Sequence, residues 1–308
     1  MPDPRHIADL RQFVQEHPFP TDILVETTTA CNLDCIMCPH GRLSRPQGRM
    51  SRELWRKIVD EVAAKSPTTR LWPALMGEPL LLGAEIFEMI RYAKEQGVRG
   101  VHLNTNLMAY PPELVEPLLS SGLDELLIGV DAATPETYAR IRRNGDYRRL
   151  VEGIRHIAAA RAERGQAAPR LTLQFIVMEE NWQEEEAFVA FWLAQGLDLQ
   201  LKIKPRTGWA DAVAPWRGIL AGTARDLPCT WLLRQMTIHW NGRVPQCDGD
   251  WDGRTWAGDV SVSSLEDIWL GPLKAIRDRH LRLDFAFQPC QSCQDWQAGR
   301  SRWVQCGK

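Results

Sequence analysis

Alternation of strand-like and helix-like runs along the first two thirds of the chain constrains the fold more than any other feature. Six apolar runs alternate with amphipathic runs, at positions 21–28, 70–77, 100–106, 124–131, 170–178 and 198–204. Strands that are separated by helices pair in parallel, because a parallel pair needs a long crossover connection. The sequence therefore predicts an α/β fold, a partial (β/α)6 barrel with its helices outside. Ligands of such a fold bind at the carboxyl ends of its strands.

The alternation of strand-like and helix-like runs ends after position 206. We therefore predict a barrel domain at 1–206 and a smaller domain at 207–308 that packs against it. Within the first part, Ser51 suits the N-cap of a helix that begins there, Gly97 suits the end of the helix at 84–97, and one long helical stretch is expected from 135 to 165. In the second part we expect an irregular segment at 208–222, a β-hairpin at 236–247 and one helix at 264–281. Asn241-Gly242 suits the tight turn of that hairpin.

Composition excludes several function classes. The formal net charge is -2 and the isoelectric point is about 6.4, so no basic surface for nucleic acid is predicted. No run of about 18 apolar residues predicts a membrane span, and the polar start lacks the apolar core of a secretory signal. We therefore expect a cytoplasmic protein. In that compartment the eight cysteines are expected to bind metal or react rather than form disulfides.

Three cysteines, Cys31, Cys35 and Cys38, fall in the loop that follows the first predicted strand. A structural zinc site needs four closed ligands, and three thiols on one loop do not suit a disulfide framework. A four-iron cube that is held by three thiolates leaves one iron open to an outside ligand, which explains the missing fourth thiol. Spacing alone favours the cube without excluding zinc.

The Cys-x3-Cys-x2-Cys spacing after a barrel strand resembles the motif of the radical S-adenosylmethionine (SAM) superfamily. The resemblance implies a [4Fe-4S] cluster whose open iron is chelated by SAM, and a 5′-deoxyadenosyl radical that abstracts hydrogen from a substrate. Gly77, Glu78 and Pro79, in MGEP, are similar to the family's GGEP element for the SAM amino group. Met76 replaces the first glycine of that element.

Two later segments extend the resemblance over about residues 20–205. Asn106, in TNL, is similar to the family's TNG after the third strand, although the glycine is missing. GVDAATPETYARIR, at 129–142, resembles the ribose-contacting segment, which makes Asp131 the expected partner of the ribose hydroxyls and Arg142 a candidate for the SAM carboxylate. A solvated helix position for Arg142 stays open.

Four further cysteines form a second group, Cys229, Cys247, Cys290 and Cys293. Four thiolates complete a closed site, either an iron–sulfur cube or zinc. Cys229, Gly242 and Cys247 resemble the start of the SPASM domain, and the single closing CxxC is similar to its shortened twitch form. That form implies one auxiliary [4Fe-4S] cluster, so that the cofactors are two [4Fe-4S] clusters and SAM.

Cys306 and three acidic residues complete the candidates. Cys306 is an incidental cysteine, a hydrogen-atom donor to a substrate radical, or a substitute cluster ligand. Asp248, Asp250 and Asp252 follow Cys247 and could bind a cationic substrate or accept a proton, and Asp248 is the expected catalytic carboxylate. Such a loop also uses carboxylates for its own turns. Glu26, Lys204, Arg206 and His40 are weaker candidates, with His40 expected to be a local hydrogen-bond partner.

The resemblance implies an enzyme that acts on a small polar metabolite in natural-product biosynthesis. An amino sugar, an aminocyclitol as in aminoglycoside biosynthesis, or another carbohydrate is expected, with oxidation of a secondary alcohol favoured over epimerisation. An external one-electron reductant such as flavodoxin or ferredoxin is the expected partner. A peptide-modifying enzyme is the alternative, although only about twenty residues precede the first strand. A non-enzymatic electron-transfer protein or zinc scaffold would have no use for the SAM-binding segments.

Overall fold

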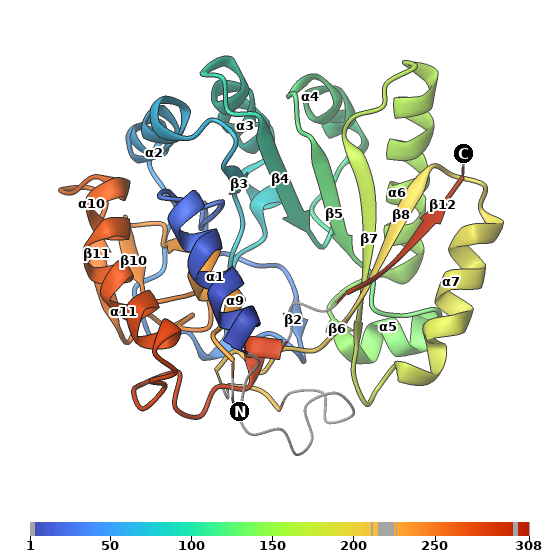
Figure 1. Cartoon of the computed structure of the whole chain (residues 1–308). Coiled ribbons are helices and arrows are strands. Elements are labelled where there is room, and N and C mark those ends of the chain that lie inside the picture. Colours follow the sequence, from blue (N-terminus) through green and yellow to red (C-terminus); the bar gives the residue numbers. More distant parts are fainter. Residues whose placement is uncertain (1–3, 211, 215–224, 226, 298–300, 308) are drawn as a thin grey trace.

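The computed structural model describes residues 4–210, 212–214, 225, 227–297 and 301–307. Its central feature is a curved sheet of eight strands in the order β12-β8-β7-β5-β4-β3-β1-β9 (Figure 1). The six inner strands are β1 (Asp22–Val25), β3 (Arg70–Trp72), β4 (Gly100–Thr105), β5 (Glu125–Gly129), β7 (Arg170–Val177) and β8 (Leu199–Pro205). All neighbouring pairs among these six are parallel, which confirms the predicted partial barrel.

Helices connect these strands and lie along the outer side of the sheet (Figure 1). They are α2 (Arg52–Lys65), α3 (Glu85–Glu95), α4 (Val115–Ser120), α6 (Tyr147–Glu163) and α7 (Glu185–Ala194), while α5 (Pro135–Ile141) lies at the lower edge of the sheet in Figure 1. Short 3-10 helices are η1 (His40–Arg42), η2 (Pro79–Leu82), η3 (Pro112–Leu114), η4 (Trp182–Glu184) and η5 (Asp295–Gln297). Ser51 caps α2 by accepting a hydrogen bond from the Leu54 amide at 3.2 Å, as predicted. Gly97, after α3, has a φ of 96°.

The helical stretch that was expected from 135 to 165 is interrupted. After α5 ends, β6 (Arg142–Arg143) pairs antiparallel with β2 (Asp34–Cys35), and α6 begins only at Tyr147. The interruption has a tertiary cause, because Arg142 turns inward to a buried carboxylate described below. Asp146 then caps α6 by accepting a hydrogen bond from the Arg149 amide at 3.1 Å.

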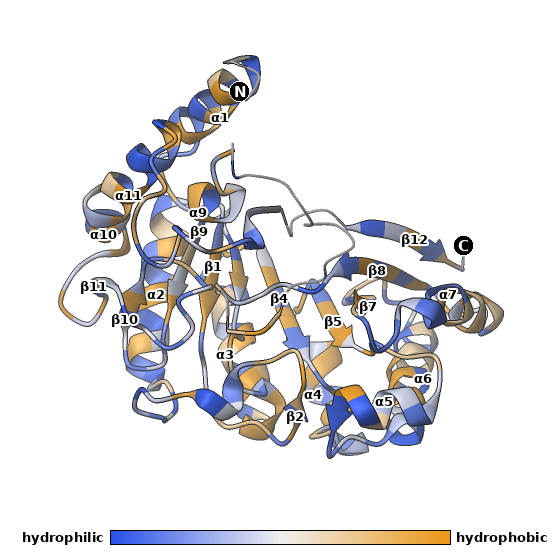
Figure 2. Ribbon diagram, turned by 90° about the horizontal axis from the view of Figure 1, so that it is seen from below, coloured by the Kyte–Doolittle hydropathy of each residue, from blue (hydrophilic) through white to orange (hydrophobic). Residues whose placement is uncertain are grey.

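The C-terminal part of the chain extends the sheet at both flanks. Strand β9 (Gln235–Ile238) runs parallel to β1, and β12 (Arg302–Cys306) runs antiparallel to β8. Figure 2 shows these two strands at opposite ends of the sheet. The predicted hairpin at 236–247 is confirmed at its turn, where Gly242 donates to the His239 carbonyl at 2.9 Å and His239 donates to the Arg243 carbonyl at 2.8 Å. Beyond the turn the strands have other partners, since β10 (Arg243–Pro245) pairs with β11 (Trp256–Asp259) and β9 pairs with β1.

The remaining helices are α1 (Pro4–Glu16), α9 (Thr230–Arg234), α10 (Leu265–Leu270) and α11 (Pro272–Leu281). The single helix that was expected at 264–281 is divided at Gly271, which lies outside the helical region, and Pro272 opens the second part. Arg11 of α1 donates to the Leu281 carbonyl at the end of α11. Most of the irregular segment expected at 208–222 lies outside the described residues. Within the described ranges, no helix has both the length and the apolar character needed to cross a membrane.

Candidate active site at the carboxyl edge of the sheet

The three clustered cysteines lie in the loop between β1 and α2, at the lower edge of the sheet in Figure 1. Backbone hydrogen bonds order this loop, since Ile36 donates to the Ile141 carbonyl at 3.0 Å and Cys38 donates to the Cys35 carbonyl at 3.1 Å. Burial raises the pKa of Cys35 to about 11 and that of Cys38 to about 12. A thiolate in this loop therefore needs a positive partner, and metal ions supply one.

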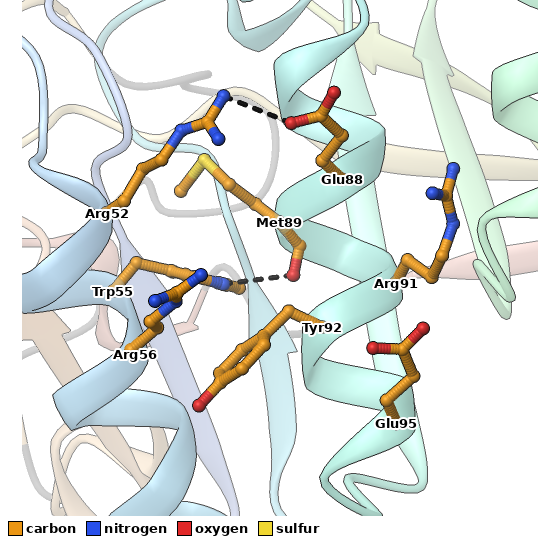
Figure 3. Close-up of a pocket in the computed structure, with 8 residues that line it drawn as sticks. All are labelled: Arg52, Trp55, Arg56, Glu88, Met89, Arg91, Tyr92 and Glu95. Carbon is orange, nitrogen blue, oxygen red and sulfur yellow. Dashed lines mark hydrogen bonds and ion pairs between the residues drawn. The ribbon is translucent and has the colours of Figure 1, made fainter.

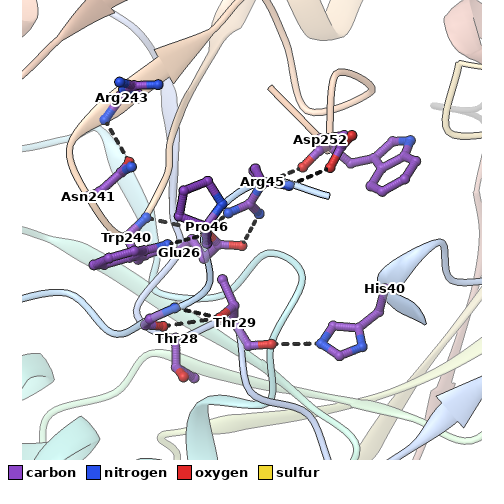
Figure 4. A network of polar contacts seen from close by, with 12 residues as sticks. Glu26, Thr28, Thr29, His40, Arg45, Pro46, Trp240, Asn241, Arg243 and Asp252 are labelled. Atoms are coloured by element: carbon purple, nitrogen blue, oxygen red, sulfur yellow. Dashed lines mark hydrogen bonds and ion pairs between the residues drawn. The ribbon is translucent and has the colours of Figure 1, made fainter. Parts of the chain in front are cut away.

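A buried ion pair fixes the same loop to the rest of the molecule (Figure 4). The Arg45 guanidinium donates to both carboxylate oxygens of Glu26, at 2.8 and 2.6 Å, and to the Trp251 carbonyl at 2.9 Å. Asp252 accepts from the Ser44 amide at 2.7 Å and from its hydroxyl at 2.6 Å. Glu26 and Asp252 are thus committed to structure, and they join the cysteine loop to the C-terminal part.

His40 has a local role, as expected. Its Nε2 lies 2.6 Å from the Thr29 carbonyl oxygen, and the Thr29 hydroxyl accepts a hydrogen bond from the Gly48 amide at 2.9 Å (Figure 4). The ring therefore holds two parts of the loop together.

The turn after β3 packs directly on the cysteine loop. A Cβ atom at Gly77 would lie 2.1 Å from the Thr28 carbonyl oxygen, so only glycine fits this approach. Glu78 is buried and accepts from the Thr105 hydroxyl and the Asn106 amide, both at 2.7 Å. Burial raises the pKa of Glu78 despite these bonds. Its carboxylate thus joins the ends of β3 and β4 and keeps the turn in place.

Asn106 follows β4 and faces the cysteine loop. Its Nδ2 donates to Asn32 Oδ1 at 2.9 Å and lies 3.9 Å from Cys31 Sγ, while its Oδ1 accepts from the Met108 amide at 2.8 Å. The side chain therefore bridges the end of β4 to the first cysteine.

Asp131 and Arg142 form a second buried ion pair, just beyond β5. Arg142 Nε and Nη2 lie 2.9 and 2.6 Å from Asp131 Oδ2, and the other carboxylate oxygen accepts from the Ile176 amide at 2.7 Å. Burial would lower the pKa of Arg142, but the Asp131 charge and hydrogen bond, together with Cys35 and Tyr138, outweigh burial and raise the pKa. Arg142 Nη1 also lies 4.0 Å from Cys35 Sγ. The alternative that was left open for Arg142, a solvated helix position, is therefore wrong.

Gly129 makes room for this arginine. A Cβ atom at position 129 would lie 1.9 Å from Arg142 Nη2. Asp131 itself has a φ of 61°, in the left-handed region that few residues other than glycine, Asn and Asp adopt. The end of β5 is thus shaped around the Asp131–Arg142 pair.

Lys204, near the end of β8, is within electrostatic range of carboxylates from both parts of the chain. Burial lowers the pKa of Lys204, while the charges of Asp248, Asp131 and Asp295 oppose that shift. Burial and the nearby Asp295 raise the pKa of Asp248, against the effects of Gln235 and Lys204. The cation and its carboxylates therefore form one polar region between the barrel edge and the second cysteine group.

The three acidic residues after Cys247 have different roles. Asp250 accepts from the Arg254 amide at 2.8 Å and the Thr255 amide at 2.7 Å, which closes its own loop. Asp252 holds the cysteine loop, as described above. Of the three, Asp248 is the one whose charge acts on Lys204.

The second cysteine group has hydrogen-bond donors directed at its sulfur atoms. Gln246 Nε2 lies 3.1 Å and His280 Nε2 lies 3.3 Å from Cys290 Sγ, and the Asp295 amide lies 3.4 Å from Cys293 Sγ. Sulfur that accepts several N–H bonds is typical of thiolate ligands in iron–sulfur sites, so this donor set fits such a group. In the described residues, no three His, Cys, Asp or Glu side chains converge as a single metal ion would require.

Cys306 lies away from both groups. It is fully buried in β12 and is paired with Leu199 at the amino end of β8, whereas Lys204 is near the carboxyl end. Five residues of strand separate these two levels, roughly 17 Å at the usual rise. This position speaks against the expected roles as hydrogen-atom donor or cluster ligand and favours a packing role.

Two relevant residues were missed by the reading of the sequence. His280 stands in the helix ten positions before Cys290, and nothing local indicates that its ring faces the sulfur. Gln246 directly precedes Cys247, and this adjacency is a signal that could have identified it.

A surface groove of about 210 Å³ lies between α2 and α3, on the outer side of the barrel (Figure 3). Trp55 and Tyr92 line it together with charged side chains, and Trp55 Nε1 donates to the Met89 carbonyl at 2.9 Å. None of the candidate site residues contributes to it.

Comparison with known proteins identifies the two parts of the chain. The model of the radical SAM superfamily matches residues 25–191, and the model of SPASM, an iron–sulfur cluster-binding domain, matches residues 229–294. An AdoMet-dependent heme synthase from Methanosarcina barkeri is 34% identical over 137 residues, which are 44% of this chain and 38% of that protein. The chain thus spans well under half of that relative's length.

Two solved structures share the fold over nearly the whole chain. BtrN in complex with AdoMet and 2-DOIA has a TM-score of 0.61 at 15% identity, covering 90% of this chain and 92% of that one. SuiB from Streptococcus suis, bound to the precursor peptide SuiA, has a TM-score of 0.68 at 13% identity, covering 93% of this chain and 73% of that one. At these identities the likeness concerns the fold alone.

Proposed function

Because this chain belongs to the radical SAM superfamily and carries a SPASM iron–sulfur domain, we propose that it oxidises a secondary alcohol of a small polar substrate. Its cofactors are SAM and two [4Fe-4S] clusters. We assign the first cluster to Cys31, Cys35 and Cys38, and the auxiliary cluster to Cys229, Cys247, Cys290 and Cys293. Gly77, Glu78, Pro79, Asn106, Asp131 and Arg142 are assigned to the SAM site.

The polar region around Lys204 carries the substrate proposal. Lys204 is half-buried and interacts electrostatically with Asp248, Asp131 and Asp295, which suits a substrate with several hydroxyl or amino groups, such as an amino sugar or aminocyclitol. Such groups can form hydrogen bonds with Asp248 and Lys204, which an apolar ligand cannot do. BtrN, the structural neighbour of similar length, contains 2-DOIA beside AdoMet, which agrees with this class. SuiB binds a peptide, so peptide modification is the second candidate.

Asp248 is proposed as the base. A carboxylate whose pKa is raised accepts a proton more readily, and this one directly follows a proposed ligand of the auxiliary cluster. When bound, SAM and the two clusters supply the removal of one hydrogen atom from carbon and the acceptance of one electron. Asp248 accepts the hydroxyl proton, and the alcohol thereby becomes a ketone. Reduction from outside, by a flavodoxin- or ferredoxin-type donor, is part of the proposal.

The test is a mass measurement with a panel of substrates. The anaerobically reconstituted protein is incubated with SAM and dithionite, and with aminocyclitols, hexosamines or peptides. We expect 5′-deoxyadenosine together with a 2 Da loss from a sugar or cyclitol. A product of unchanged mass in ordinary water that takes up deuterium in heavy water would indicate epimerisation instead. Turnover of peptides alone would refute the small-molecule proposal. Asp248→Asn should keep SAM cleavage but lose the oxidised product, while Asp250→Asn serves as the control from the same loop.

A further inference from the structure

His280 lies between two members of the second cysteine group and contacts both. Its Nδ1 is 3.2 Å from the Cys229 amide nitrogen, and its Nε2 is 3.3 Å from Cys290 Sγ. We propose that His280 is a positioning residue that ties Cys229 to Cys290 and raises the reduction potential of the auxiliary cluster. This inference rests on the proposed function, because it requires that these cysteines hold that cluster.

The donors around the ring determine where its proton lies. A backbone amide can only donate, so the bond from Cys229 makes Nδ1 an acceptor. Arg225 Nη2 lies 3.4 Å from the same atom, and a guanidinium also only donates. With Nδ1 unprotonated, the neutral ring carries its proton on Nε2. The ring therefore donates that proton to Cys290 Sγ.

Packing keeps the ring in this orientation. His280 is fully buried, and the rings of Phe285 and Phe287 meet it edge-on at centroid distances of 5.2 and 5.7 Å. Arg225 in turn stacks on Phe285 at 4.3 Å and donates to the Cys290 carbonyl at 3.0 Å. The ring is thus held from both sides, and no water is needed to complete its hydrogen bonds.

The bond to sulfur has an electronic consequence. Reduction adds negative charge to an iron–sulfur cluster, and an N–H donor stabilises the more negative state. Cys290 Sγ receives two such donors, His280 Nε2 and Gln246 Nε2 at 3.1 Å. Removing the donor from His280 should therefore lower the reduction potential. A higher potential suits a cluster that accepts an electron from an oxidised substrate.

Two substitutions separate the two contacts of the ring. His280→Asn keeps an oxygen near the position of Nδ1 as acceptor for the Cys229 amide but has no donor that reaches Cys290. His280→Gln places an amide N–H near the position of Nε2 and keeps the donor. Both are made in the full chain with Cys31, Cys35 and Cys38 replaced by alanine, so that only the auxiliary cluster remains. The reduction potential is measured by redox titration followed by EPR.

We expect His280→Asn to shift the reduction equilibrium about tenfold toward the oxidised state, about 59 mV for one electron. His280→Gln should remain within about threefold of the parent. Equal potentials in the parent and His280→Asn, at full iron content, would overturn this inference and leave the proposed function intact. An iron-free parent would overturn both.

If neither substituted protein retains iron, pulsed EPR of the parent labelled with ¹⁵N-histidine decides the question. A nitrogen coupled to the reduced cluster supports the bond from His280, and the absence of any histidine coupling overturns it.

Discussion

Substitution of Gly129 by alanine tests the tight fit around the Asp131–Arg142 pair. The new methyl group would lie 1.9 Å from Arg142 Nη2, and the guanidinium cannot retreat without giving up its bonds to Asp131 at 2.9 and 2.6 Å. Asp131 has no exposed surface, so a displaced arginine leaves a buried carboxylate with one fewer partner. Breaking a buried pair costs about 3–5 kcal/mol.

We expect Gly129→Ala to lower the free energy of unfolding by about 3 kcal/mol, the low end of this range, because the arginine is displaced rather than removed. At roughly 2 °C per kcal/mol for a chain of this size, the melting temperature should fall by about 6 °C. The assay is thermal unfolding of the reconstituted protein without SAM, followed by circular dichroism. Gly41→Ala is the matched control, since its Cβ would meet only Asp34 Oδ1 at 3.7 Å.

A double-substitution cycle shows whether Arg142 is the cause. In the Arg142→Ala background the colliding atoms are gone, so Gly129→Ala should have little further effect. A full loss of stability in that background, or no loss in the parent, would show that the reasoning is wrong.

Three further outcomes follow from the structure. Gly77→Ala should abolish SAM binding, measured by equilibrium dialysis, because its Cβ would lie 2.1 Å from the Thr28 carbonyl oxygen, and wild-type affinity would contradict this. Cys306→Ala should leave product formation unchanged but lower the melting temperature, since the side chain is fully buried, and loss of product alone would restore a catalytic role. Burial would raise the pKa of Glu125, but hydrogen bonds from neighbours led by His102 lower it to about 2. Because the folded pKa is depressed, Glu125→Gln should lower the free energy of unfolding by its full amount at pH 6. This loss relative to the wild type should shrink as the pH falls from about 4.5 toward 2. A loss that stays constant with pH in urea unfolding would refute the prediction.

The sequence predicted the six inner strands because their apolar runs are separated by helix-like runs of suitable length. It did not predict the interruption at Arg142, since the cause is a carboxylate eleven positions earlier that only the folded chain brings near. The division at Gly271 had a local signal, glycine followed by proline, that a continuous apolar pattern concealed. The pairing of β9 could not be predicted either, because the Asn241-Gly242 turn says nothing of the free edge at β1.

For the site, spacing was enough to group the cysteines, and the resemblance was enough to select the residues near them. The side chains that form hydrogen bonds with the cysteine sulfur atoms could not be identified in this way. His280 and Gln246 are recognised only once the turns and helices direct their N–H groups at Cys290. Likewise, the sequence could not separate the roles of Asp248, Asp250 and Asp252. The partners of Asp250 are local, but Asp252 contacts Ser44 and Asp248 interacts with Lys204, both in distant parts of the chain.

The strands added at the two flanks of the sheet have a consequence for how the chain reaches its folded state. Asp22 pairs with Gln235, so this contact closes a loop of roughly 210 residues, and pairings this distant in sequence form slowly. Until β9 and β12 arrive, the outer strands β1 and β8 present unpaired backbone groups, to which other chains can add. During synthesis the barrel segment therefore passes through a period of exposure to aggregation, and chaperones that cover the two open edges should increase the yield of folded protein.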